Sequence, residues 1–116
     1  MSYDETLAER VRWVLADVDS EITERRMFGG LAFMLDGRMV TGIVGDELMI
    51  RVGAAAATEA LAARHVRAMD FTGRPMKSMV FVAQEGLKGP ALRRWINQAV
   101  TFVRSLPPKT TNRTVR

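Results

Sequence analysis

The stretch that decides the fold is residues 31–44, which read LAFMLDGRMVTGIV. It consists of two apolar runs separated by Asp36-Gly37, a dipeptide that suits a type I′ turn because both positions tolerate a positive φ. After the next turn, at Gly45-Asp46, residues 47–52 (ELMIRV) alternate between apolar and charged positions, as at Glu47, Met49 and Arg51. The sequence therefore predicts a three-stranded antiparallel meander.

Helical periodicity is found on both sides of the meander. In residues 3–18 apolar side chains recur on one face of a helix, and Ser2 or Asp4 is placed to cap its start. The Ala-rich residues 54–64 predict a short second helix. A third helix begins at Pro90, and its apolar stripe consists of Leu92, Trp95, Ile96, Ala99, Phe102 and Val103.

The remaining segments complete the expected order of elements. Residues 66–71 and 78–83 predict two strands joined by a turn at 72–75, whereas residues 21–26 are expected to be a polar connector. The fold class is then α+β: a two-layer sandwich of order α-β-β-β-α-β-β-α, with the first and last helices covering one face of an antiparallel sheet.

Composition narrows the possible functions. The chain has 116 residues, no Cys, one His and a formal net charge of +4, which excludes a disulfide framework, a thiol nucleophile and the usual zinc ligand sets. We expect one domain over residues 1–106 and a disordered basic tail over 107–116. Neither a signal peptide nor a membrane span is predicted, so the expected location is cytoplasmic.

The most distinctive segment is residues 25–30, RRMFGG. Arg25 and Arg26 enter a Gly-rich strand, where guanidinium groups and the backbone N–H groups exposed at Gly29 and Gly30 could hold a phosphate or carboxylate. The alternative is a surface arginine pair beside a strand bulge. The segment has neither the spacing nor the lysine of a P-loop.

A second cationic segment is the predicted turn at residues 73–77, GRPMK, which presents Arg74 and Lys77. It could dock an anion or an acidic partner, or it could be a rigid turn kept soluble by its charges. If these two cations converged with Arg25 and Arg26, the four would form one basic edge. No combination of His65 with the carboxylates suggests a catalytic site.

Several short motifs in order resemble the TfoX N-terminal domain family. They are residues 26–30 (RMFGG), 35–39 (LDGRM), 46–52 (DELMIRV), 71–76 (FTGRPM), 80–82 (VFV), Trp95 and 105–109 (SLPPK). The resemblance implies a two-layer α+β fold of the secretion-chaperone-like type and a cytoplasmic bacterial protein. Full-length TfoX/Sxy relatives regulate natural competence with a cyclic-AMP-responsive transcription factor, and the family offers no established catalytic residues.

We therefore expect a non-enzymatic regulatory or adaptor domain that acts through protein contacts, either with a protein partner or with itself as a homodimer formed through a sheet face or edge. No cofactor and no metal are expected. One alternative is direct nucleic-acid binding through Arg25, Arg26, Arg74, Lys77, Arg93, Arg94 and the basic tail, for which a steep salt dependence is predicted. Another is a small anionic ligand held near Arg25 and Arg26.

Overall fold

The computed structural model describes residues 3–27, 29–71 and 74–106, with only the backbone described for 69–71 and 74–77. The predicted tail at 107–116 and the turn at Thr72-Gly73 lie outside this range. The elements, in chain order, are α1 (Glu5–Leu15), β1 (Ile22–Met27), β2 (Gly30–Leu35), β3 (Arg38–Val44), β4 (Glu47–Arg51), α2 (Ala54–Leu61), β5 (Val66–Phe71), β6 (Arg74–Val82), a 3-10 turn (Gln84–Leu87) and α3 (Ala91–Arg104).

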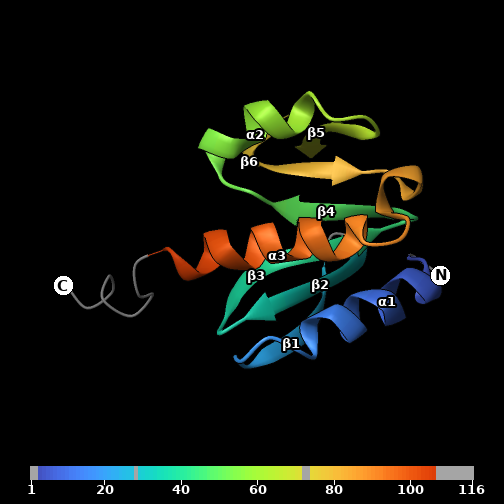
Figure 1. The fold of residues 1–116 in the computed structure, drawn as a ribbon, viewed down its shortest axis with the longest axis vertical. Helices are drawn as coiled ribbons and strands as arrows, with labels where there is room; N and C mark the ends of the chain where they lie inside the picture. Colours follow the sequence, from blue (N-terminus) through green and yellow to red (C-terminus); the bar gives the residue numbers. More distant parts are fainter. Residues whose placement is uncertain (1–2, 28, 72–73, 107–116) are drawn as a thin grey trace.

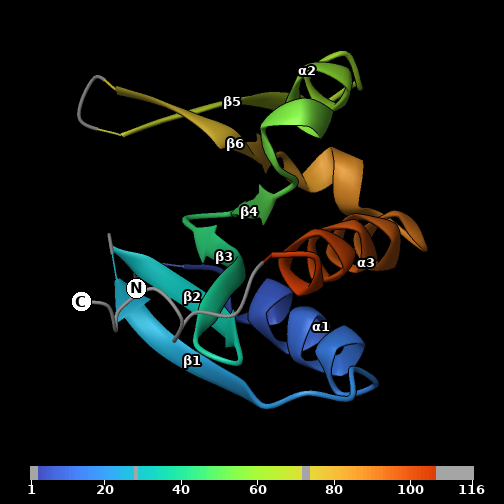
Figure 2. The same ribbon diagram turned by 90° about the vertical axis from the view of Figure 1, so that its left-hand side faces the viewer.

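The strands form one antiparallel sheet in the order β1-β2-β3-β4-β6-β5. All three helices cover the same face of it, α1 and α3 over the meander and α2 beside β6 (Figures 1 and 2). The α+β fold class and the antiparallel sheet are confirmed. We call the two sides of the sheet the helix side and the helix-free side.

The order of the predicted elements is also confirmed, with one strand added between the first helix and the predicted meander. Residues 22–27, expected to be a polar connector, form the edge strand β1, which pairs with β2 from Ile22↔Leu35 to Met27↔Gly30. Five of its six residues are exposed, so β1 carries no alternating hydrophobic pattern. Backbone pairing rather than side-chain burial makes this segment a strand.

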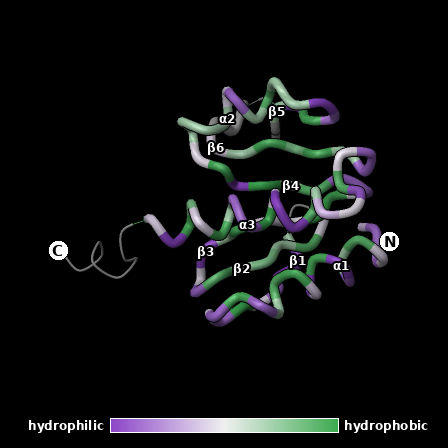
Figure 3. Tube along the Cα trace, viewed as in Figure 1, coloured by the Kyte–Doolittle hydropathy of each residue, from purple (hydrophilic) through white to green (hydrophobic). Residues whose placement is uncertain are grey.

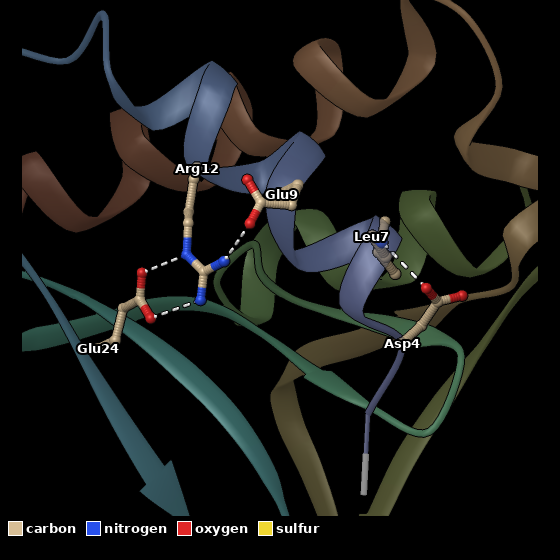
Figure 4. A network of polar contacts seen from close by, with 5 residues as sticks. All are labelled: Asp4, Leu7, Glu9, Arg12 and Glu24. Atoms are coloured by element: carbon tan, nitrogen blue, oxygen red, sulfur yellow. Dashed lines mark hydrogen bonds and ion pairs between the residues drawn. The ribbon is translucent and has the colours of Figure 1, made fainter. Parts of the chain in front are cut away.

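The Asp36-Gly37 turn is as predicted, since φ is 51° at Asp36 and 85° at Gly37, both in the region that a type I′ turn needs. The predicted cap of the first helix is Asp4, whose Oδ1 accepts a hydrogen bond from the Leu7 N–H at 3.1 Å (Figure 4). That bond and one from Gln84 lower the pKa of Asp4.

The core lies between the helices and the sheet. Figure 3 shows hydrophobic and hydrophilic residues alternating along the helices. The hydrophobic helix residues are buried together with those of the sheet, and this core includes Val11, Phe33, Ile43, Ile50 and Ile96, each at most 1% exposed. A smaller apolar cluster of Met49, Met79 and Phe81 is separate from it. Within the described residues, no helix is long and apolar enough to cross a membrane.

Candidate partner-binding surface

The structure places Arg25 and Arg26 next to each other on β1, both exposed. Glu24 reaches Arg12 of α1, which fixes its side chain on the helix side. Since side chains alternate along a strand, Arg25 projects from the helix-free side and Arg26 from the helix side. The two guanidinium groups therefore do not face one common pocket, and the segment matches a surface arginine pair on an edge strand.

Gly29 and Gly30 have separate steric roles in the turn between β1 and β2. Gly29 has a φ of 76° and open space around the position of a Cβ atom. Gly30 is buried, and a Cβ atom there would lie 2.0 Å from the carbonyl oxygen of Ile43 on β3. The two glycines thus allow the turn and the close approach of β2 to β3. The bulge expected beside them is found further along, between Phe33 and Met34.

Arg74 and Lys77, expected to lie in a turn, belong to the first half of β6, where the backbone pairs Arg74 with Phe71 of β5. β2, β3 and β4 separate this strand from β1. The two pairs of cations therefore start from opposite halves of the sheet, and the strand order does not make one basic edge from them.

One row of backbone pairs crosses the whole helix-free side. It runs through Arg25, Ala32, Gly42, Met49, Phe81 and Arg67. At its far end the Arg67 guanidinium lies 4.5 Å from the centroid of the Phe81 ring and bonds both carboxylate oxygens of Glu47 at 2.6 and 3.0 Å. These hydrogen bonds raise the pKa of Arg67.

Arg51 on β4 is the most unusual cation of the described chain. Its Nε is buried and has no hydrogen-bond partner among the described residues, while its Nη1 donates to the carbonyl oxygen of Met39 at 3.3 Å. The guanidinium lies 5.8 Å from the centroid of the Phe102 ring. Burial, together with the charge of Arg38, lowers the pKa of Arg51.

An ion pair ties α1 to β1. Arg12 donates from Nε and Nη2 to the two carboxylate oxygens of Glu24, at 2.7 and 2.9 Å, and from Nη1 to Glu9 at 3.0 Å (Figure 4). The bidentate geometry is the strong form of this contact. It lowers the pKa of Glu24 and raises that of Arg12.

The most exposed large hydrophobic residue among those described is Trp13 on α1, at 75%. It borders a groove of about 320 Å³ between α1 and the start of α3, lined by Arg10, Trp13, Val14, Gly89, Pro90, Leu92 and Arg93. We call this the Trp13 groove. Arg10 donates to the carbonyl oxygen of Leu87 at 2.7 Å and Arg93 pairs with Asp17 at 3.3 Å, and both arginines line the same groove as the indole.

The sequence interpretation missed Trp13, although a signal was present. Its helical neighbours at i−4 and i+4, Glu9 and Asp17, are charged, so the tryptophan interrupts the polar face of an amphipathic helix. A large aromatic residue at such a position is not needed by the core. The groove itself could not be predicted, because it depends on how α3 packs beside α1.

Over the residues that the structure describes, these features define a class: an α+β domain with its helices on one side of the sheet, an edge strand paired on one side, and a groove beside Trp13 in the helix layer. The described residues hold no group of three or more metal-ligating side chains. The family described as TfoX N-terminal domain matches residues 14–103, and the chain belongs to that family. Neither the curated proteins nor the solved structures give a match.

Proposed function

We propose that this protein is a cytoplasmic, non-enzymatic regulatory or adaptor domain that acts by binding another protein. The observation that carries the proposal is Trp13, exposed at the border of a groove that Arg10 and Arg93 also line. Tryptophan and arginine are the residue types that dominate binding energy at protein interfaces. Membership of the TfoX N-terminal domain family supports a regulatory role, because full-length TfoX/Sxy relatives regulate natural competence.

The distribution of polar groups supports binding rather than catalysis. Among the described residues, Thr41 is the only polar or charged residue that is buried as a whole, and its hydroxyl donates to the carbonyl oxygen of Met49. The carboxyl groups with shifted pKa values, Asp4 and Glu24, serve a helix cap and an ion pair. None of these groups is placed in a cleft with a second acid or base, which is the arrangement that general acid–base catalysis uses.

The partner that fits the Trp13 groove carries an apolar side chain beside a carboxylate. The exposed indole offers apolar contact, and the guanidinium groups of Arg10 and Arg93, which also line the groove, offer charge-assisted hydrogen bonds. A partner carboxylate would have to compete with Leu87 for Arg10 and with Asp17 for Arg93. This competition is modest, because Leu87 offers only a neutral carbonyl oxygen and the Arg93–Asp17 ion pair is exposed, at 3.3 Å.

The test is a crosslinked pull-down from the lysate of the source cell with three tagged baits: wild type, Trp13→Ala and Leu61→Ala. Leu61 is 41% exposed on α2 and serves as a matched loss of exposed apolar surface. We expect at least one protein to be captured by wild type and Leu61→Ala and lost with Trp13→Ala. An identical set of captured proteins for all three baits would refute the proposal.

A direct measurement follows on any protein so identified. Because Trp13 is exposed, its replacement is expected to change the free energy of unfolding by only about 0.5 kcal/mol. A loss of affinity with Trp13→Ala would therefore report the contact itself. Arg93→Ala should weaken binding less, since part of its hydrogen-bonding capacity is used by Asp17.

A further inference from the structure

The edge of β1 that faces away from β2 is a second candidate binding surface. β1 is the first strand of the sheet, and β2 is its only pairing partner among the described residues. The strand contains no proline, and an unpaired strand edge is a template for pairing with another strand. We propose that two copies of this chain pair antiparallel through their β1 edges, which would join the two sheets into one.

The backbone shows which groups are available for this pairing. The Asp36 N–H donates to the Glu21 carbonyl oxygen at 3.0 Å, which makes 21 and 36 a hydrogen-bonded pair. Such pairs alternate along an antiparallel ladder, and the register of β1 with β2 has no shift. Ile22, Glu24 and Arg26 therefore direct their N–H and C=O groups away from β2, toward a second copy.

Symmetry restricts the register. A two-fold axis perpendicular to the sheet places the helices of both copies on the same face of the joined sheet. Each β1 residue must therefore lie opposite a residue of the other copy whose side chain projects from that same face. Only two such registers pair five strand residues of each copy. One centres on Glu24 and places the two Glu24 carboxylates opposite each other, whereas the other centres on Arg25.

Charge favours the register centred on Arg25. It places Glu24 opposite Arg26 twice, in hydrogen-bonded pairs on the helix side, and each such pair of opposite charges stabilises a sheet. Each Glu24 carboxylate, already held by Arg12 of its own chain, would then lie between two guanidinium groups. Arg25 faces Arg25 on the helix-free side, and this repulsion weakens the dimer without changing its register.

Cysteine crosslinking tests the register cleanly, because the chain has no Cys. In the proposed dimer, position 25 faces itself in a non-hydrogen-bonded pair with Cα atoms about 4.5 Å apart, within the range for a disulfide. Position 23 lies about 14 Å from its own copy. Arg25→Cys should therefore form a disulfide dimer under mild oxidation, and Thr23→Cys, on the same side of the same strand, should not.

Charge exchange tests the pairing without a covalent bond. Arg26→Glu alone and Glu24→Arg alone each place like charges opposite each other, so each should weaken self-association roughly tenfold or more in sedimentation. Mixing the two variants places opposite charges at both positions and should give a heterodimer. Arg25→Thr removes the central repulsion and should strengthen the wild-type dimer.

The β1 pairing does not depend on the Trp13 groove, and the Trp13→Ala variant distinguishes this proposal from the proposed partner binding. We expect that variant to dimerise like wild type. The β1 pairing is overturned if wild type and Arg25→Thr both stay monomeric near millimolar concentration. It is also overturned if Thr23→Cys crosslinks as readily as Arg25→Cys, or if Trp13→Ala abolishes the dimer.

Discussion

Replacing Gly30 with alanine would drive β2 and β3 apart at the start of the meander. The new Cβ would lie 2.0 Å from the Ile43 carbonyl oxygen, 3.1 Å from the Ile43 carbonyl carbon and 3.2 Å from Cγ2 of Val44. The nearest atoms belong to the backbone of a central strand. No rotamer change can remove the overlap, so the strands themselves must move.

The magnitude follows from the size of that overlap. Carbon–oxygen contacts lie at about 3.3 Å or more, so the strands must separate by more than ~1 Å. Overpacking of this kind costs about 1–3 kcal/mol, and loss of one or two ladder hydrogen bonds adds about 1 kcal/mol each. We expect Gly30→Ala to lower the free energy of unfolding by about 2–5 kcal/mol, from a total of roughly 6–17 kcal/mol for a chain of this length.

Gly29→Ala is the matched control one residue earlier. Gly29 has a positive φ of 76° but nothing within 4 Å of a Cβ atom, so alanine there meets backbone strain of about 1–2 kcal/mol, partly offset by a stiffer unfolded chain. Urea unfolding followed by circular dichroism measures both variants. An equal loss of stability in the two, or a smaller loss for Gly30→Ala, would refute the steric reasoning.

Other predictions concern the ion pair and a second glycine. Glu24→Gln should cost about 1 kcal/mol or less at pH 7, because the pair with Arg12 is partly exposed. Since the pKa of Glu24 is lowered from its ordinary value of 4.5, its contribution is present above that pH and lost as the pH falls through the folded-state pKa. The stabilities of wild type and Glu24→Gln should therefore converge as the pH is lowered through that folded-state pKa, and a difference that stays constant as the pH falls well below 4.5 would contradict the assignment. Gly53→Ala should cost about 2–5 kcal/mol in the same urea assay, because φ is 89° and the new Cβ would lie 2.4 Å from the Phe102 ring. Phe102→Ala in that background should recover part of the loss, and strictly additive effects would exclude the clash.

Much of the fold could be predicted because its signals are local. Asp36-Gly37 requires two positive φ angles, and the apolar stripes of α1 and α3 have the helical period whatever they pack against. β1 could not be predicted in this way. An edge strand exposed on both faces has no buried side to impose alternation, and only the neighbouring β2 gives its backbone a partner.

The candidate site, too, could be predicted only where its signals are local in the sequence. Arg25 and Arg26 are exposed, and their role as an anion or partner contact stays a prediction, whereas the sequence left open whether they meet Arg74 and Lys77, because that depends on strand order. The chain passes from β4 through α2 to β5 and returns with β6 beside β4, so β2, β3 and β4 lie between the strands that carry the two pairs. Such long-range pairing leaves no trace in residue spacing.

That strand order has a consequence for folding. Every pair of neighbouring strands is adjacent in the chain except β4 and β6, so the meander and the β5–β6 hairpin are each built from local contacts. Their seam is four backbone pairs, from Leu48↔Val82 to Arg51↔Met79. Local pairs close with less loss of chain entropy than distant ones. We therefore expect the two units to form early and the β4–β6 seam to be the slow, cooperative step that completes the sheet.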